Sequence, residues 1–242
     1  MSRNDAPAAA PVQAFARTHN GALRLAVAAN FRKPLDELAA EFERSQGIGL
    51  SATYGSSGLL AAQIRQGAPF DVFLSADTSR PDALIGDGLA VAPVTIYARG
   101  RVVLRTTGSP AATRHTRPRR IGIPNPNLAP YGAAAIQCLD RLGVRGQIQE
   151  RLVFGNNVNQ VDHFLESGAL HLGFVALSQL VARNVPRQEY WVCPTAYHAP
   201  IAQGAVILRR SRQLSAARTL LRFMIRPATQ ARLEHLGYPS GD

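Results

Sequence analysis

Residues 48–75 read IGLSATYGSSGLLAAQIRQGAPFDVFLS and contain one complete strand–helix–strand unit. Ile48–Tyr54 and Asp71–Ser75 are short segments typical of strands, whereas Gly58–Gln66 repeats apolar residues at helical spacing. Glycine, serine and proline separate the three elements. Because two strands joined by a helix usually lie parallel in one sheet, this stretch predicts an α/β fold.

The same alternation continues on both sides of this unit. Leu23–Ala28 is typical of a short buried strand, and Lys33–Ser45 of a helix with one apolar face. Further strands are expected at 101–104, 121–124, 152–154, 172–175, 192–193 and 204–208, and further helices at 81–87, 131–142, 159–167, 178–183, 213–224 and 227–236. These elements are too many for one small sheet, and no repeat period is visible. We therefore predict two α/β lobes, each a mostly parallel sheet flanked by helices.

The chain is expected to pass between the two lobes twice, near Tyr97–Val102 and near Pro200–Gly204. Lobe I then comprises residues 22–98 and 205–242, so that the two terminal helices return to it. Lobe II comprises residues 99–204. The crossover segments would act as a hinge within one discontinuous binding unit.

Two segments are expected to lack regular structure. Residues 1–21 form a flexible leader rich in alanine and proline, without the continuous apolar segment that a secretory signal requires. Export is therefore not predicted by the sequence. Residues 105–120 form a polar loop rich in arginine and threonine.

The formal net charge of +11 invites a nucleic-acid interpretation. Arginine supplies 26 of the 27 basic residues, however, and is spread over the whole chain. Its dense runs at 114–120 and 209–212 are not interleaved with the aromatic residues that stack on bases. A solvated basic surface is the simpler interpretation, and long-range attraction of an anionic ligand is a further use. No stretch approaches the roughly 18 consecutive apolar residues of a membrane-spanning helix, so we expect a water-soluble, folded protein.

The chain has two cysteines, Cys138 and Cys193, which lie 55 residues apart. This separation is not a metal-ligand spacing. Cys138 falls in an expected helix and Cys193 in an expected strand, so buried free thiols are the favoured state and a disulfide is the alternative.

Four expected strand-to-helix junctions share one chemical character. Each places small or amide side chains at the start of a helix, and none has a charged residue at its core; they are 28–31 (AANF), 54–58 (YGSSG), 125–132 (NPNLAPYG) and 155–159 (GNNVN). The first N–H groups of a helix have no intrahelical partner, and the positive end of the helix dipole points outward there. Such an end attracts anions. Because two junctions fall in each lobe, facing lobes could present four helix ends to one anion.

Any single junction has a simpler explanation. Asn and Ser before a helix are ordinary N-caps, and glycine there permits a tight turn. Four uncharged junctions together favour a pocket of neutral donors for a fully ionised oxyanion. Hydrogen bonds to charged groups contribute roughly 1.5–3 kcal/mol each, so five or six could supply the roughly 8 kcal/mol of a micromolar site.

Several segments resemble the periplasmic molybdate-binding proteins of ABC importers, which are type II solute-binding proteins. In order, they are AVAANF (26–31), TYGSSGLLAAQIRQGAPFDVFLSAD (53–77), IPNPNLAPYGAAA (123–135), GNNVNQ (155–160), GFVALSQL (173–180) and HAPIAQGAVIL (198–208). The resemblance runs from about Leu23 to the C-terminus. It implies a two-lobed periplasmic-binding-protein fold that closes on its ligand around a hinge.

The resemblance also implies the ligand contacts. Asn30 stands where the family uses a small polar residue whose side chain and N–H both donate. Ser57 stands at the hydroxyl donor, with Ser56 beside it, and Tyr131 and Val158 stand where backbone N–H groups complete the shell.

A fifth donor stays open. Some members use a tyrosine hydroxyl at the position that Ala176 occupies here, so this sequence is similar to members without it. Asn157 or a second N–H near Asn30 are the candidates. The family's usually longer connection before the strand at 121–124 is a second departure, because a short loop replaces it here.

By this resemblance the protein is a non-enzymatic, periplasmic receptor that binds molybdate or tungstate and delivers it to the membrane permease of an ABC importer. No cofactor is implied, and no side chain coordinates a metal directly, because the metal enters as its oxyanion. A monomer suffices for this mechanism, and no nucleic-acid partner is expected. The sequence leaves open the affinity, the preference between molybdate and tungstate, and the compartment.

Three alternatives have a different function. The first is a binding protein for another small anion on the same fold. The second is a cytoplasmic oxyanion sensor, although no helix-turn-helix segment is visible. The third is an enzyme using Asp162, His163 and Ser167, but these residues lie along one short expected helix, where such neighbours usually form a solvated face. No nucleophile-elbow motif or metal-ligand spacing supports catalysis.

Overall fold

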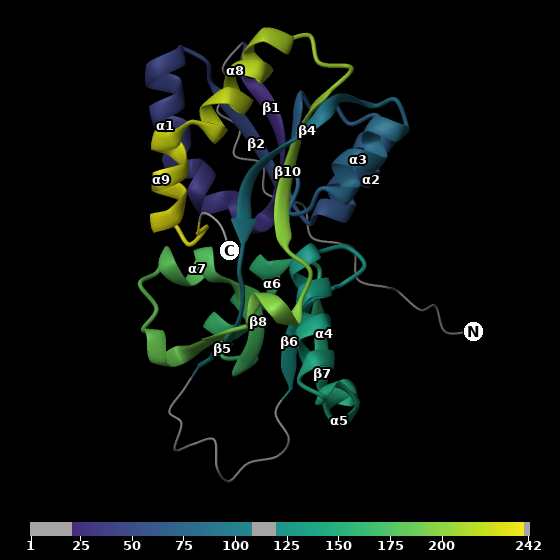
Figure 1. The fold of residues 1–242 in the computed structure, drawn as a ribbon, viewed down its shortest axis with the longest axis vertical. Helices are drawn as coiled ribbons and strands as arrows, with labels where there is room; N and C mark the ends of the chain where they lie inside the picture. Colours follow the sequence, from purple (N-terminus) through teal and green to yellow (C-terminus); the bar gives the residue numbers. More distant parts are fainter. Residues whose placement is uncertain (1–20, 108–119, 240–242) are drawn as a thin grey trace, which may run out of the picture.

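The computed structural model describes residues 21–107 and 120–239 and contains two five-stranded sheets, one in each lobe (Figure 1). The first sheet has the strand order β2-β1-β3-β10-β4. Its strands are β1 (Leu23–Ala28), β2 (Leu50–Gly55), β3 (Val72–Leu74), β4 (Ala90–Gly100) and β10 (Ile201–Leu208). β1 runs parallel to β2 and β3, whereas β10 runs antiparallel to β3 and β4.

The second sheet repeats this pattern with the order β7-β6-β8-β5-β9. Its strands are β5 (Val102–Thr106), β6 (Ile121–Pro124), β7 (Leu152–Gly155), β8 (Leu172–Ala176) and β9 (Tyr190–Val192). β6 is parallel to β7 and β8, and β5 is antiparallel to β8 and β9. The predicted two-lobed α/β fold is therefore confirmed, and the strands next to the crossovers run antiparallel in both sheets.

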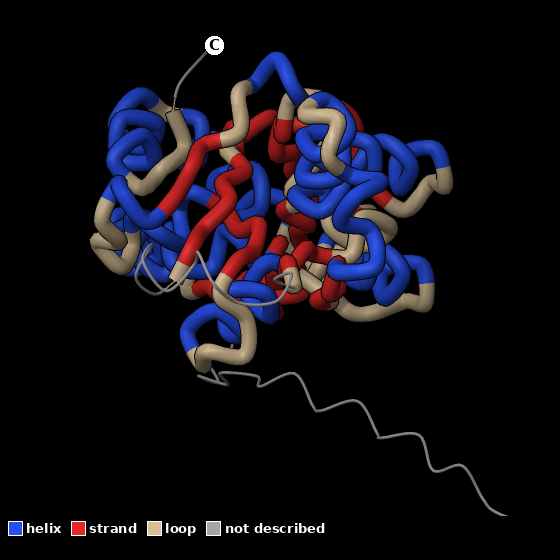
Figure 2. The backbone as a smooth tube through the Cα atoms, turned by 90° about the horizontal axis from the view of Figure 1, so that it is seen from below, coloured by secondary structure: helices blue, strands red, loops and turns tan. Residues whose placement is uncertain are grey.

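Helices cover both faces of each sheet (Figure 2). The α-helices are α1 (Arg32–Gln46), α2 (Ser57–Arg65), α3 (Ser79–Gly86), α4 (Pro130–Arg141), α5 (Arg145–Ile148), α6 (Val158–Glu166), α7 (Leu177–Val181), α8 (Leu214–Ile225) and α9 (Pro227–His235). Short 3-10 helices are η1 (Ala29–Phe31), η3 (Gln149–Arg151), η4 (Arg187–Glu189) and η5 (Thr195–Tyr197). None of the helices in the described ranges is both long and apolar enough to cross a membrane.

Separate apolar clusters form on the two faces of each sheet. In lobe I, one cluster joins β1 and β3 to α1, α8 and α9, and the other joins the opposite face to α2 and α3. In lobe II, α4 packs on one face and α6 and α7 on the other. The terminal helices therefore return to lobe I, as predicted.

The chain crosses between the sheets at two adjacent places. Only Arg101 separates the end of β4 from the start of β5, and residues 193–200 lead from β9 back to β10. The two crossings lie side by side, because Ile201 pairs with Gly100 where β10 meets β4. The lobe bounds drawn from the sequence stay a prediction at the level of single residues.

The structure differs from the expected elements in three places. Residues 90–100 form the longest strand, β4, which the sequence pattern did not reveal because polar and apolar residues do not alternate along it. The short helix α5 was also missed. The loop expected at residues 105–120 begins later than predicted, since Arg105 and Thr106 belong to β5; most of that loop, like the leader at 1–20, lies outside the described residues.

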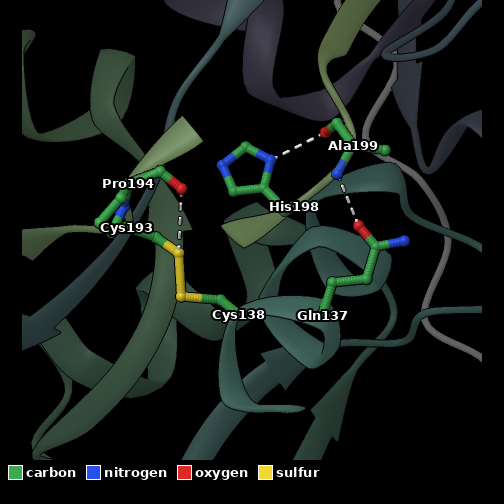
Figure 3. The surroundings of a disulfide bond; sticks show 6 residues. All are labelled: Gln137, Cys138, Cys193, Pro194, His198 and Ala199. Carbon is green, nitrogen blue, oxygen red and sulfur yellow. Dashed lines mark hydrogen bonds between the residues drawn. A yellow bond between two sulfur atoms is a disulfide. The ribbon is translucent and has the colours of Figure 1, made fainter. Parts of the chain in front are cut away.

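The cysteines correct a further expectation. Cys138 in α4 and Cys193 after β9 form a disulfide with a Cα–Cα distance of 6.5 Å (Figure 3), so the prediction of free thiols is wrong. Their 55-residue separation along the chain carries no information about distance in space. The packing of α4 against the face of the second sheet brings the two residues together.

Candidate functional site

All four junctions predicted from the sequence are starts of helices. η1 and α2 begin in lobe I, with Ala28 and Ser56 as N-caps, and α4 and α6 begin in lobe II, with Ala129 and Asn157 as N-caps. Each follows the carboxyl end of a strand, where open α/β sheets bind their ligands. The first-turn N–H groups of these helices have no intrahelical partner.

The four helix starts line one small pocket, of about 10 Å³, between the lobes. All six residues singled out from the sequence line it: Asn30, Ser56, Ser57, Tyr131, Asn157 and Val158. The remaining lining residues are glycine, alanine and proline, so the described wall of this pocket carries no charged side chain. The structure therefore brings together residues that lie up to 128 positions apart in the printed sequence.

The two serines of this pocket differ in what their hydroxyl groups already bind. Ser57 Oγ accepts a hydrogen bond of 2.9 Å from the N–H of Ala76, which ties the start of α2 to the end of β3. Ser56 Oγ is buried and has no hydrogen-bond partner among the described residues. A buried hydroxyl without a hydrogen-bond partner destabilises the protein unless a ligand or a water molecule forms that bond. Ser56 therefore presents the more available hydroxyl, whereas the sequence comparison ranked Ser57 first.

The Asn30 side chain is already occupied inside the protein. Its Nδ2 donates to Gln203 Oε1 at 2.9 Å and to Tyr238 Oη at 2.9 Å, with Tyr131 Oη at 3.4 Å. An amide group has two hydrogens, so these partners use both. The backbone N–H groups of η1 are then the donors that Asn30 and its neighbour can offer to a ligand.

Asn157 has the ordinary capping role. Its side chain accepts a 3.1 Å hydrogen bond from Gln160 N in the first turn of α6. The side-chain oxygen of Asn157 therefore stabilises the helix start, and the next residue, Val158, lines the pocket. Ala176 is fully buried at the start of α7 and does not line this pocket.

A second pocket lies beside the first and shares Ala29 and Asn30 with it. Its wall contains Arg32, Lys33 and Arg183 with a single carboxylate, Asp162. The uncharged pocket is thus bordered by a positively charged one, which favours the approach of anions.

The residues of the enzymatic alternative do not form a catalytic group. Asp162 is buried and forms an ion pair with Arg183, and its other oxygen lies 3.7 Å from Arg105 Nη1. His163 is exposed, and the Ser167 hydroxyl donates to the carbonyl of Phe164 at 3.3 Å. No group of three or more His, Cys, Asp or Glu residues able to hold a metal ion occurs within residues 21–107 and 120–239.

A buried polar cluster behind the pocket was not predicted from the sequence. Tyr97, Gln203 and Tyr238 are each 3% exposed or less and hydrogen-bond to one another or to Asn30. One feature of the sequence could have indicated this cluster. Gln203 is a polar residue within the otherwise apolar strand segment AQGAVIL (202–208).

Comparison with known proteins places these features in context. The family described as bacterial extracellular solute-binding protein matches residues 23–239. The molybdate-binding protein ModA of Rhodobacter capsulatus is 37% identical over 225 residues, which cover 90% of this chain and 88% of that protein. The structure of the periplasmic molybdate-binding protein of Azotobacter vinelandii matches with a TM-score of 0.81 and 34% identity, covering 91% of this chain and 100% of the other. The sulfate-binding protein SubI of Mycobacterium tuberculosis shares the fold alone, with a TM-score of 0.72 and 13% identity over 90% of this chain and 86% of its own.

Proposed function

Because this chain belongs to the bacterial extracellular solute-binding proteins and, within them, to the molybdate-binding proteins, we propose that it binds one molybdate ion between its lobes. Tungstate has the same charge and tetrahedral shape, so the protein binds it as well. The bound ion is delivered to the membrane permease of an ABC importer.

One observation carries the proposal: four helix starts, two from each lobe, line a single pocket without charged side chains. A fully ionised tetrahedral oxyanion is recognised there by hydrogen-bond donors alone. Backbone N–H groups and the positive ends of helix dipoles supply such donors without a counter-ion. A cationic ligand finds no acidic side chain in this wall.

We assign the donors as follows. Ser56 donates its unpaired hydroxyl, and Ser57 donates its hydroxyl hydrogen while its oxygen stays bound to Ala76 N. Backbone N–H groups at Asn30, Tyr131 and Val158 complete the shell from the starts of η1, α4 and α6. A second N–H in η1 is a sixth donor, and it takes the place of the tyrosine hydroxyl that this chain lacks at Ala176.

Selectivity against sulfate rests on the size of the cavity. Sulfate carries the same charge in a smaller tetrahedron, so it reaches fewer of the donors at hydrogen-bond distance. Backbone donors on packed helices hold the cavity at one radius, because moving them requires moving a lobe.

The protein acts as a receptor and not as an enzyme. Closure on the anion shifts the population of lobe arrangements toward the closed form, which the permease recognises. Among the described residues that line the pocket, the hydroxyl groups of Ser56 and Ser57 lie beside no His, Asp, Glu or Lys side chain that could act as their base.

The proposed compartment is the periplasm. The disulfide between Cys138 and Cys193 supports it, because disulfides persist in oxidising compartments and are rare in the cytosol. The relative from Azotobacter vinelandii is also periplasmic by its description.

Calorimetric titration with molybdate, tungstate, sulfate and phosphate tests the proposal. We expect one-to-one binding of molybdate and tungstate with micromolar or tighter affinity, that is, about −8 kcal/mol or more. Ser56→Ala should weaken binding, and Ser167→Ala, which changes an exposed serine outside the pocket, should not. Preferential binding of sulfate or phosphate would favour the alternative of a receptor for another anion, and no heat with any of the four would refute the assignment.

A further inference from the structure

A buried polar cluster directly behind the anion pocket connects the two lobes. Its members are Asn30, Tyr97, Tyr131, Gln203 and Tyr238, none of which is more than 3% exposed. Four of them lie on or beside the first sheet, on η1, β4 and β10 and after α9, and are counted here with lobe I. This includes Gln203 on β10, which the bounds drawn from the sequence placed in lobe II. Tyr131, on α4, is the member that belongs to lobe II.

Gln203 is the centre of this cluster. Its Oε1 accepts hydrogen bonds from Asn30 Nδ2 at 2.9 Å and from Tyr97 Oη at 3.0 Å, both within lobe I. Its Nε2 donates across the lobes to Tyr131 Oη at 3.3 Å. Gln203 thereby connects the lobe I side of the pocket to the hydroxyl of a lobe II residue.

Tyr131 takes part in both the pocket and the cluster. Its backbone lies at the start of α4 and lines the pocket, while its hydroxyl reaches over the crossover between β4 and β5. A Cβ atom at Gly100 would collide with this hydroxyl, so the glycine at the end of β4 leaves the space that the tyrosine fills. The position of the Tyr131 N–H is therefore coupled to a contact that its own side chain makes with lobe I.

A second contact crosses the lobes at the other side of η1. The carbonyl oxygen of Asn30 accepts from Ser178 Oγ of lobe II at 3.3 Å and from Tyr238 Oη of lobe I at 2.9 Å. The turn that offers N–H groups to the ligand is thus held from both lobes.

All three tyrosine hydroxyl groups stay neutral donors and acceptors. Burial raises the pKa of Tyr97 and of Tyr131 well above the ordinary tyrosine value, and it raises the pKa of Tyr238 to about 12. Ionisation therefore does not interrupt these hydrogen bonds at neutral pH.

We propose that Tyr131, Gln203 and Asn30, with Ser178, form an interlobe latch that holds the closed state and sets the radius of the anion pocket. They act as positioning residues, because the side-chain bonds are between protein groups and not with the ligand. The inference rests on the proposed function, since a latch requires a cleft that closes on an anion.

The physical reason lies in the directionality of hydrogen bonds. Apolar lobe surfaces can slide over one another at small cost, whereas buried polar groups must meet at one distance and angle or remain unpaired. The hydroxyl of Tyr131 meets Gln203 at a single lobe angle. That angle also fixes the separation between the donors of α4 and those of η1.

The test compares two tyrosines of the same cluster. Tyr131→Phe deletes the cross-lobe hydroxyl, and Tyr97→Phe deletes an equally buried hydroxyl whose partners, Gln203 Oε1 and Ser75 O, both lie in lobe I. Each full-length variant is titrated with molybdate and sulfate, and dissociation rates are measured by rapid mixing. Thermal unfolding of the ligand-free protein reports stability separately.

We expect Tyr131→Phe to weaken molybdate affinity about two- to tenfold, the usual range for one hydrogen bond. The loss should lie in a faster dissociation rate, and the preference for molybdate over sulfate should fall with it. Ligand-free stability should change by only about 1 °C, because the proposed latch forms only when the lobes close. Tyr97→Phe should do the opposite: it lowers ligand-free stability and changes affinity less than about twofold.

Ser178→Ala is the second variant, and it tests the latch if Tyr131→Phe does not fold. It should also speed dissociation, by a smaller factor. Unchanged dissociation and unchanged selectivity in the folded cross-lobe variants would overturn the latch, as would equal effects of Tyr131→Phe and Tyr97→Phe on affinity. If the unaltered protein bound neither molybdate nor tungstate, the proposed function would fail and the latch with it; loss confined to the variants concerns the latch alone.

Discussion

Two neighbouring pockets between the lobes share Ala29 and Asn30 and yet differ in charge. The smaller one is lined only by uncharged residues, and the larger one contains Arg32, Lys33 and Arg183. Attraction and recognition of an anion therefore depend on different groups in this protein. Cationic side chains attract an anion over a distance, whereas neutral donors held on packed helices discriminate its size at contact.

The largest effect should come from placing a negative charge in the neutral pocket. Ser56→Asp would set a carboxylate beside the bound dianion, and two unit charges 4 Å apart near a protein surface repel by about 4 kcal/mol. We expect molybdate affinity to fall about a thousandfold, measured by calorimetry. Ser56→Asn, which adds similar bulk without charge, is the control. Equal losses in the two variants would show that bulk and not charge is responsible.

Removal of the disulfide tests whether the donors of the neutral pocket depend on the cross-link in the C-terminal half of α4. Replacing Cys138 and Cys193 by alanine removes a cross-link over 55 residues and should lower the free energy of unfolding by about 2–4 kcal/mol. Chemical denaturation of the unaltered protein and of the double variant measures this difference. Molybdate affinity at 25 °C should stay within about threefold, because the pocket donors are also positioned by packing of α4 on the sheet. A much larger affinity loss would mean that the disulfide positions the donors directly.

Closure of the neutral pocket depends on a close contact at Gly58. Its N–H donates to the carbonyl of Leu128 in the other lobe at 2.9 Å, and a Cβ atom there would lie 3.0 Å from Leu128 Cα. Gly58→Ala should hold the lobes slightly apart and weaken molybdate binding about tenfold, or roughly 1.4 kcal/mol. Gly86→Ala is the matched control, because this other helical glycine has no atom within 4 Å of an added Cβ. Titration of both variants gives the comparison, and equal affinities would contradict a closed state of this geometry.

The smallest effect should come from the charged pocket. Lys33→Gln removes a charge beside the entrance but touches no donor of the neutral pocket. The association rate should fall about two- to threefold at low salt, and the dissociation rate should not change. Stopped-flow measurements over a range of ionic strength test this, with Arg218→Gln on the far face of lobe I as control. A change in dissociation instead would place Lys33 in contact with the anion.

Most of the fold could be predicted from the sequence because local patterns decide it. The strand Leu23–Ala28 and the strand Ile121–Pro124 have the predicted bounds, and the other predicted elements lie within a few residues of the observed ones. Exceptions arose where local pattern and environment disagree. Residues 90–100 form a strand without alternation because they pair with β10 over their length, and Arg105 lies in a strand because carboxylates of Asp162 and Glu166 compensate its burial.

The residues of the candidate site could also be predicted, but their states could not. The resemblance favoured Ser57 over its neighbour Ser56 as the hydroxyl donor. Only the position of Ala76 N decides that the Ser57 hydroxyl is occupied and the Ser56 hydroxyl unpaired. Asn30 was expected to offer its side chain to the ligand. The structure instead directs that side chain to Gln203 and Tyr238, which follow it by 173 and 208 positions.

The α/β alternation, the two lobes, the four uncharged helix starts and the family of the chain can all be recognised in its amino-acid sequence. These properties depend on spacing and residue type over short stretches, which a sequence displays directly. The tertiary structure alone decided the disulfide, the cluster around Gln203 and the cross-lobe contact of Tyr131. Each of these depends on groups that are distant along the chain and become neighbours only when the two sheets fold and the lobes meet.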